Sequence, residues 1–278
     1  MDSGRITVLV ENTAGGRGLL AEHGLSFWIE LGSRRILFDT GQSDILFHNA
    51  HILGIDLSNV DAIVLSHGHY DHVGGLKGIL DIAPAVPIYL HPQALEAKFA
   101  RSGEQSRHIG MEPEVAQMLE RRIHSGLGSF TNGPAEILPG MWATGEIPRR
   151  SAFEDTGGSF YLDPSCTRPD ELLDDQALVL EINDGLVVVL GCAHAGVVNT
   201  LDYVAELFPG RPIRTVLGGM HLVRASRARI AHTIEAIRRH NVQRIGPAHC
   251  TGLEASRELW NVLPERCFTC NVGAQIML

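Results

Sequence analysis

A ten-residue stretch, Ser66 to Gly75, constrains this chain more than any other part of it. It reads Ser-His-Gly-His-Tyr-Asp-His-Val-Gly-Gly, and four of its side chains can bind a metal ion: His67, His69, Asp71 and His72. The apolar run 62–65 precedes it, and the length and β-branched content of that run predict a buried strand. Gly68 allows a sharp backbone turn directly afterwards. The sequence therefore predicts a strand that ends in a loop of metal-binding groups.

The spacing of these four groups suits a metal centre. His67 and His69 can face one ion, and Asp71 and His72, further along the turn, can serve a second ion nearby. Neutral imidazole binds Zn, Fe, Ni or Cu and carboxylate suits harder ions, so the mixed set favours borderline metals such as Zn or Fe. A polar surface loop that happens to be rich in histidine is the alternative. Four such groups directly after a core strand favour the metal centre.

The second half of the chain repeats this arrangement three times. Apolar strands are predicted at 186–190, 213–217 and 242–245, and each runs into a glycine-containing turn that carries a histidine. These histidines are His194, His221 and His249. A single histidine at a strand end is more often structural than a ligand. If the three strands share one sheet, however, the histidines meet at one edge, and together with the first motif they indicate a metal site.

Composition limits the class of protein. The chain has 278 residues, of which 44% are hydrophobic, so it can bury a large core in one α/β domain or two smaller ones. A net charge of −9 argues against nucleic acid as a partner. No apolar run reaches membrane-spanning length and no signal peptide is evident, so we expect no membrane partner and a cytoplasmic location. Five cysteines form no disulfide pattern.

The pattern His-x-His-x-Asp-His after a buried strand resembles the metal motif of the metallo-β-lactamase-fold hydrolases. Other segments are similar to the branch of metal-dependent hydrolases related to dihydropterin ribofuranosyl-aminobenzene phosphate synthases, and the resemblance spans roughly 6–273. These segments are Phe38-Asp39-Thr40-Gly41, Thr144-Gly145-Glu146-Ile147-Pro148-Arg149, Gly191-Cys192-Ala193-His194, Gly218-Gly219-Met220-His221-Leu222 and Pro247-Ala248-His249-Cys250-Thr251-Gly252. The alternation of β and α segments favours helix-covered mixed sheets. The resemblance implies an α/β, four-layer αββα sandwich of two mixed sheets in a single domain, 1–278.

The resemblance also implies a ligand set for two divalent ions, with Zn expected first and Fe or Mn as alternatives. One ion would be held by His67, His69 and His194, and the other by Asp71, His72 and His249. Most of the superfamily bridges the two ions with an aspartate, but this chain has His221 at the corresponding turn. An imidazole cannot bridge two close ions as a carboxylate does. His221 is therefore expected to bind one ion terminally or to act on the substrate as an acid.

Four further residues have open roles. Asp39 is either a turn carboxylate or an acceptor that orients a ligand histidine, and the resemblance favours the second role. Arg149 either binds a phosphate or carboxylate of the substrate or makes a structural ion pair. Cys192 and Cys250, beside ligand positions, are either soft groups near the metal or buried structural thiols.

Two segments lack a clear motif. Residues 92–100 are predicted to form a helix that begins at a proline. Residues 101–140 are the least regular part of the chain, with one helical stretch near 113–121, and this composition is typical of a lid, a substrate-gripping insertion or a surface excursion.

The expected function is metal-dependent hydrolysis of an ester or phosphoester, in which a dinuclear site activates water and Asp71 and His221 take part in catalysis. The substrate is expected to be a small molecule that carries a phosphate. The alternative is a transferase that joins a pterin-methyl diphosphate to a ribofuranosyl-aminobenzene phosphate. A non-catalytic metal-binding or redox protein on the same fold is the alternative of another class.

Overall fold

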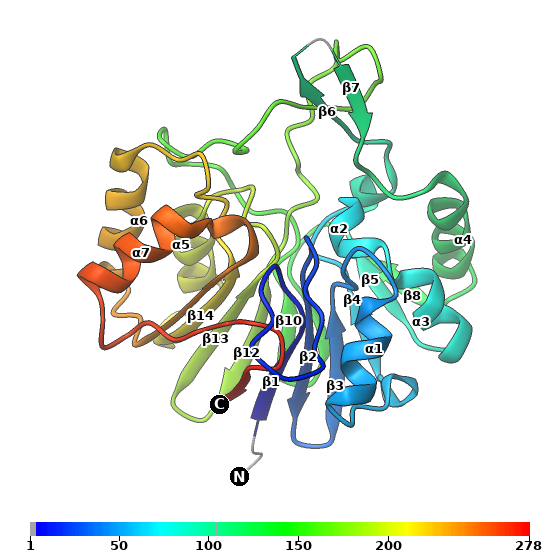
Figure 1. The fold of residues 1–278 in the computed structure, drawn as a ribbon, viewed down its shortest axis with the longest axis horizontal. Helices are drawn as coiled ribbons and strands as arrows, with labels where there is room; N and C mark the ends of the chain where they lie inside the picture. The colour runs from blue at the N-terminus through cyan, green and yellow to red at the C-terminus, as the bar shows by residue number, and fades with distance from the viewer. Residues whose placement is uncertain (1–3, 104) are drawn as a thin grey trace.

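The computed structural model describes residues 4–103 and 105–278, and two large mixed sheets dominate it (Figure 1). The first sheet contains seven strands: β1 (Gly4–Val10), β2 (Ser26–Leu31), β3 (Arg34–Phe38), β4 (Ala62–Val64), β5 (Ile88–Leu90), β8 (Gly128–Phe130) and β16 (Gln275–Met277). Their order across the sheet is β16-β1-β2-β3-β4-β5-β8. Strands β3, β4, β5 and β8 are parallel to one another, so their carboxyl ends lie along the same edge.

The second sheet contains six strands: β9 (Ala135–Leu138), β10 (Met141–Ala143), β12 (Leu178–Ile182), β13 (Gly185–Leu190), β14 (Ile213–Gly219) and β15 (Arg244–Ala248). Their order is β15-β14-β13-β12-β10-β9, with β13, β14 and β15 parallel. A small third sheet, in the order β11-β6-β7, stands above the sandwich and contains β6 (Phe99–Ser102), β7 (Gln105–His108) and β11 (Phe160–Tyr161) (Figure 1).

Helices cover the outer faces of both sheets. Their bounds are α1 (Ile45–Ile52), α2 (Tyr70–Val73), α3 (Leu76–Ile82), α4 (Pro113–His124), α5 (Val197–Leu207), α6 (Arg227–Arg239) and α7 (Leu253–Val262). Helices α1, α3 and α4 lie beside the first sheet, and α5, α6 and α7 lie beside the second (Figure 1). Within the part of the chain that the structure describes, no helix has both the length and the apolar character that crossing a membrane requires.

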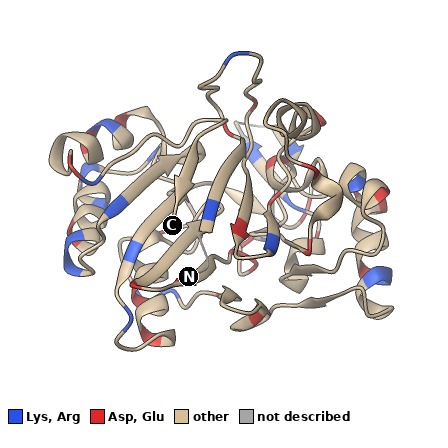
Figure 2. Cartoon of the chain, turned by 90° about the horizontal axis from the view of Figure 1, so that it is seen from below, with Lys and Arg blue, Asp and Glu red and all other residues tan. Residues whose placement is uncertain are grey.

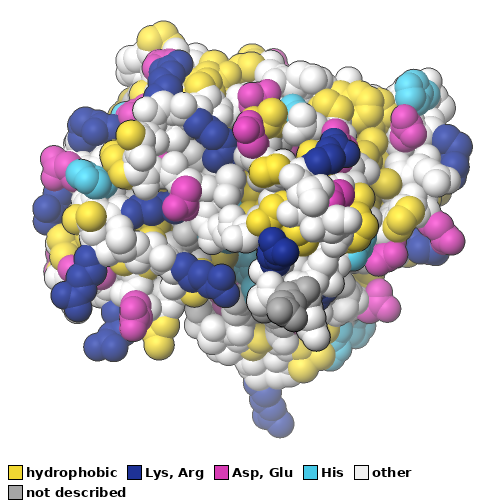
Figure 3. All heavy atoms as spheres, turned by 90° about the horizontal axis from the view of Figure 1, so that it is seen from above, with side chains coloured by type: hydrophobic (Ala, Val, Ile, Leu, Met, Phe, Trp, Pro, Cys, Tyr) yellow, Lys and Arg dark blue, Asp and Glu magenta, His cyan; other side chains and the backbone are white. Residues whose placement is uncertain are grey.

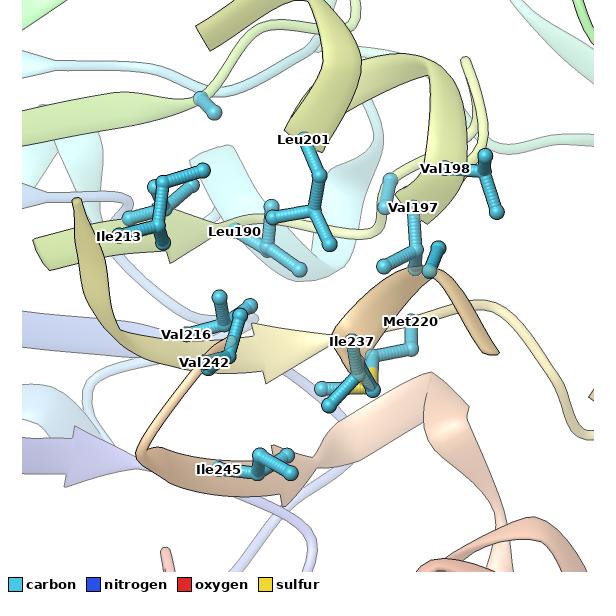
Figure 4. Close-up of a cluster of buried hydrophobic side chains, with 14 of the residues drawn as sticks. Leu190, Val197, Val198, Leu201, Ile213, Val216, Met220, Ile237, Val242 and Ile245 are labelled. Carbon is cyan, nitrogen blue, oxygen red and sulfur yellow. The ribbon is translucent and has the colours of Figure 1, made fainter. Parts of the chain in front are cut away.

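Three buried apolar clusters separate the layers. One lies between the two sheets and includes Phe27 of β2 and Leu180 of β12. A second lies between the first sheet and its helices. The third joins the second sheet to α5 and α6, and Figure 4 shows Leu201 of α5 beside Leu190 of β13. Two sheets between two helical layers confirm the αββα sandwich, because each sheet buries both of its faces.

The segment 92–140 differs from its prediction. Residues 92–95 form only a 3-10 turn, and the chain then enters β6 instead of continuing as a helix. The fully buried Lys98 explains this difference, because its ammonium binds Asp170 and Asp174. Within 101–140, α4, β8 and β9 belong to the sandwich, and the β6–β7 hairpin projects from it (Figure 1). Of the segment for which a lid was predicted, the β6–β7 hairpin is the part outside the sandwich, so the prediction of a lid now concerns this hairpin alone.

Candidate metal centre

The loop after β4 carries the first group of donors, and its backbone is tightly enclosed. A Cβ on Gly68 would lie 2.3 Å from the carbonyl oxygen of Ala94, so only glycine fits there. The Gly68 amide donates a 2.8 Å hydrogen bond to Asp174 Oδ2. Helix α2 begins directly after His69 and carries Asp71 and His72.

The structure places the rings of His67, His69 and His194 next to one another. His67 Nε2 lies 2.9 Å from His69 Nδ1, and the His194 ring centroid lies 4.9 Å from that of His67 and 5.0 Å from that of His69. His194 Nδ1 is hydrogen-bonded to the Thr156 carbonyl at 2.8 Å, and its buried Nε2 has no hydrogen-bond partner among the described residues. A buried imidazole nitrogen of this kind is costly unless something else binds it, and a metal ion satisfies it.

The structure also brings Asp71, His72 and His249 together. Asp71 Oδ2 lies 3.4 Å from His249 Nε2 and 3.9 Å from His72 Nε2. Two ligands bound to one tetrahedral ion at 2.0–2.1 Å lie about 3.4 Å apart, so these separations fit a shared ion. Asn12 Oδ1 accepts a hydrogen bond from His249 Nδ1 at 2.8 Å when that nitrogen is protonated, which leaves Nε2 free to bind metal.

Asp39 makes the contacts expected of a carboxylate that orients a ligand histidine. Its carboxylate accepts hydrogen bonds from the Ser66 amide, the Ser66 hydroxyl and His72 Nδ1, each at 2.7 Å. All three groups are fully buried. Because the carboxylate accepts from His72 Nδ1, the tautomer with a free Nε2 is favoured. This contact supports the predicted role of Asp39 in orienting a ligand histidine.

His221 lies beside the first group of donors, with its ring centroid 4.3 Å from that of His194. One of its ring nitrogens lies within 4.8 Å of both Cys192 Sγ and Cys250 Sγ. Gly157 presses on the imidazole, since a Cβ there would lie 1.8 Å from His221 Cδ2. His221 also lines the cavity described below, so both predicted roles, terminal ligand and acid, are compatible with its position.

Backbone strain is concentrated at this edge of the two sheets. Asp39, Ala193, His221 and His249 have φ values of 59°, 53°, 45° and 51°, and each follows the carboxyl end of a strand. Positive φ is uncommon for residues other than glycine and costs of the order of 1–3 kcal/mol. Such strain clusters at functional sites, and here it lies in the loops that carry candidate donors.

The electrostatic environment differs between the two groups of donors. Burial and the neighbouring imidazoles lower the pKa of His67 and His194 well below the ordinary value, and burial lowers the pKa of His69 to about 3. Neutral imidazole is the form that binds metal. Burial also opposes charge on His72, but the Asp39 and Asp71 carboxylates outweigh it and raise the pKa of His72 to about 9. The surroundings of the His72 ring therefore favour a positive charge, as the binding site of a metal cation does.

A cavity of about 1090 Å³ opens onto the donors. The β6–β7 hairpin and the 157–160 loop form part of its wall. The exposed side chains of Arg101, Arg107 and Arg224 also line it, and Figure 3 shows Lys and Arg side chains on this face. Arg107 donates to the Tyr70 hydroxyl at 3.2 Å and lies over its ring. Seen from the opposite end, charged residues of both signs are interspersed (Figure 2).

The prediction that Arg149 contacts a substrate is not supported by its position. The residue does not line the cavity, and its guanidinium donates to the carbonyl oxygens of His194, Glu171 and Leu172 at 2.6–3.1 Å. Arg149 instead fixes the turn that carries His194. The guanidinium fork that suits a phosphate also suits convergent main-chain carbonyls, and sequence alone does not separate the two uses.

Sequence reasoning missed His23, which lies in the loop between β1 and β2. Its Nε2 lies 3.0 Å from Asp71 Oδ2, and His23, Asp71 and His249 can together hold one ion. No local motif surrounds His23, and only the proximity of its loop to α2 reveals it. The cavity arginines were also missed, because they come from two separate segments and acquire meaning only where those segments meet.

Comparisons with known proteins agree with this geometry. The model of the metallo-beta-lactamase superfamily matches residues 20–197. A curated relative from Methanocaldococcus jannaschii, named 7,8-dihydropterin-6-methyl-4-(beta-D-ribofuranosyl)-aminobenzene-5'-phosphate synthase, is 32% identical over 92% of this chain and 90% of its own.

Two solved structures share the fold. Tm1679, described as a metal-dependent hydrolase of the beta-lactamase superfamily, is 31% identical with a TM-score of 0.81 over 99% of both chains. Yeast PDE1 is 10% identical with a TM-score of 0.62 over 100% of both chains, a likeness of fold alone. The family model and the two relatives above 30% identity agree, and the chain belongs to the metallo-beta-lactamase superfamily.

Proposed function

We propose that the chain is a metal-dependent hydrolase that cleaves a phosphoester of a small molecule. The observation that carries this proposal is the combination of several overlapping groups of candidate metal donors with three arginines around one cavity. In a chain with a net charge of −9, Arg101, Arg107 and Arg224 gather positive potential where an anionic substrate would enter. Guanidinium groups also match the geometry of phosphate oxygens.

Two divalent ions fit the donors, with Zn first and Fe or Mn as alternatives. The proposed ligands are His67, His69 and His194 for one ion and Asp71, His72 and His249 for the other. When bound, such ions supply Lewis-acid polarisation and a nucleophile at neutral pH. The chain itself must then orient the substrate, hold the ligands in their binding tautomers and deliver a proton.

The remaining roles fall to residues that line the cavity. Arg107 is held against Tyr70 and would bind phosphate oxygens that do not react. Asp71 also lines the cavity and would orient the attacking water. A bond forms between water oxygen and phosphorus, the ester P–O bond breaks, and His221 would give a proton to the leaving oxygen. The β6–β7 hairpin, which forms part of the cavity wall, would close over the bound substrate as a lid.

The test compares two exposed arginines on the metal-loaded protein. Arg107→Gln should raise the KM for a phosphodiester by roughly tenfold, the equivalent of one charge-assisted hydrogen bond. Arg150→Gln should leave it unchanged, because Arg150 lies outside this cavity and pairs with Glu206. Neutral carboxylic esters should be poor substrates for both. Equal KM values in the two variants, or preferred cleavage of neutral esters, would contradict the proposal.

A second candidate is the transferase reaction, favoured by the 32% identity with a protein named as a synthase. In this reaction a pterin-methyl diphosphate donates its pterin-methyl group to a ribofuranosyl-aminobenzene phosphate, diphosphate leaves, and no water attacks. The two reactions differ in one measurable respect. Release of diphosphate that requires the acceptor identifies the transferase, whereas release of phosphate or alcohol without an acceptor identifies the hydrolase.

A non-catalytic metal-binding or redox protein is the remaining alternative. It predicts full metal loading with neither reaction. The same measurements decide it, provided that metal content is determined on the same samples.

A further inference from the structure

The thiol of Cys192 lies between the two groups of metal donors. Its Sγ lies within 4.8 Å of ligand nitrogens of His67 and His194, and also within 4.8 Å of ligand nitrogens of His72 and His249. Among the described residues, these two sets of possible metal ligands have only Cys192 in common. A donor within reach of both ions is what a bridging ligand requires, and His221 cannot take that role in place of an aspartate.

The contact between Cys192 and His72 has the separation expected of two ligands on one ion. Cys192 Sγ lies 3.3 Å from His72 Nε2. A thiolate at about 2.3 Å and an imidazole nitrogen at about 2.0 Å from one tetrahedral ion lie about 3.5 Å apart. Because Asp39 binds His72 Nδ1, Nε2 is the nitrogen of this ring that faces the thiol.

The backbone around Cys192 is built for close approach. A Cβ on Gly191 would lie 2.0 Å from Ser66 Oγ, so this glycine lets the turn after β13 meet the turn after β4. A Cβ on Gly219 would lie 2.7 Å from Cys250 Sγ and 3.3 Å from Cys192 Cα. Bulkier residues at these two positions would separate the loops. The thiol is buried, yet it lines the cavity, so an ion that enters the cavity can reach it.

We propose that Cys192 is a metal ligand whose sulfur bridges the two ions, and that it takes the role which an aspartate at the position of His221 has in most of the superfamily. Thiolate is a strong ligand for Zn, and a sulfur atom has the lone pairs to bind two ions at once. The thiol releases its proton to solvent as the metal–sulfur bonds form, and no electron is transferred. The inference rests on the proposed dinuclear centre but is independent of the substrate.

The test loads the metal-free protein with cobalt(II), because cobalt bound to thiolate gives a sulfur-to-metal charge-transfer absorption in the near ultraviolet. In the wild-type protein this absorption should grow through two equivalents of cobalt. Cys192→Ser should lose most of it and should fall from about two bound ions to about one. Cys270→Ser is the matched control, since Cys270 is another buried thiol and, among the described residues, belongs to none of the candidate groups of metal ligands. It should keep both the absorption and the stoichiometry.

Three results would overturn the inference: an absorption that stops growing at one equivalent, a Cys192→Ser protein that keeps the wild-type absorption, or a loss confined to Cys250→Ser. If Cys192→Ser does not fold, the same titration of Cys250→Ser decides the matter: an absorption that still grows through two equivalents supports the bridge, and one that stops at one equivalent overturns it. X-ray absorption on the zinc-loaded protein provides an independent check, with a sulfur shell expected at about 2.3 Å. A protein that shows the sulfur signal but cleaves no phosphoester would support the bridge and contradict the proposed hydrolase function, so the two failures are distinguishable.

Discussion

The two halves of the molecule supply metal donors in different ways. In the first half, His67, His69, Asp71 and His72 come from one short loop and the helix that follows it. In the second half, His194, His221 and His249 come from the ends of three separate strands. The first set is fixed by local chain geometry and the second by sheet topology. A local set can be read from the sequence, whereas a distributed set depends on parallel strands being in register.

The prediction with the largest expected effect tests whether the donors of the first half are positioned by their own loop alone. The buried Lys98 ammonium holds Asp170 and Asp174 at 2.9 Å each, and Asp174 in turn holds Gly68 of the metal loop. Lys98→Met should lower the free energy of unfolding by about 3–5 kcal/mol, because buried carboxylates lose their counter-ion. Lys77→Met, which removes an exposed pair with Asp81, should cost no more than about 1 kcal/mol. Denaturant unfolding measures both.

The same ion cluster gives a pH dependence. Burial alone would raise the pKa of Asp174, but Lys98 and its hydrogen bond outweigh burial and lower that pKa. A depressed folded-state pKa contributes stability that is complete above the unfolded value, about 3.9, and is lost as the pH falls through the folded value. Unfolding free energies measured down to acid pH should therefore fall less steeply in Lys98→Met than in the wild-type protein. Parallel curves would contradict this account.

Removal of the metal tests the donors of both halves in one measurement. Ions bound by donors from both sheets stabilise the folded state by about 2.7 kcal/mol when their concentration is a hundred times Kd. Chelated protein should unfold at a correspondingly lower temperature than reloaded protein. An unchanged melting temperature would mean that the donors do not hold a metal between the sheets.

Asp39 tests how far the first set depends on residues outside the loop. Asp39→Ala removes the acceptor of three buried hydrogen bonds and should cost about 1–3 kcal/mol of stability and 10–100-fold in metal affinity. Asp61→Ala is the matched surface control, since Asp61 accepts one exposed hydrogen bond from the Arg35 amide. Metal titration followed by calorimetry would distinguish the two variants. Equal affinities would show that the loop orients its own histidines.

A substitution at Gly157 tests the donors of the second half and has the smallest expected effect. Gly157→Ala places a methyl group against His221 at a backbone φ of +80°, so it should cost about 1 kcal/mol and displace that imidazole. Gly133→Ala is the control, because a Cβ there meets no atom within 4 Å. The histidine resonances in NMR spectra should shift for His221 in the first variant and not in the second.

The contrast between a local and a distributed set of donors also explains which features could be predicted from the sequence. The strands and the donors of the metal loop were predictable because strands carry apolar runs and the loop is a compact motif, whereas the four-layer sandwich and the division of ligands between two ions came from the family resemblance. The orienting role of Asp39 was favoured only by the family resemblance, and the sequence did not show that its partner is His72, which lies 33 positions away. His23 has no motif at all, and its role depends on a loop packing against α2.

The errors have physical causes too. The helix expected at 92–100 fails because Lys98 must reach buried carboxylates, and this tertiary contact overrides local propensity. For Arg149 the sequence left a substrate contact and a structural role open, because it does not show which acceptors surround a guanidinium.

The positive φ values at the strand ends also have a consequence for sequence design. Someone who optimised this backbone for stability alone would place glycine or asparagine at positions 39, 193, 221 and 249, since these residues relieve the strain. Three of those four changes would delete a residue of the candidate site: Asp39, His221 or His249. Algorithms that reward only folding energy would therefore erase the chemistry while improving the scaffold. Positions at which the best-folding residue and the observed residue disagree are a practical signal for locating sites in chains of this fold.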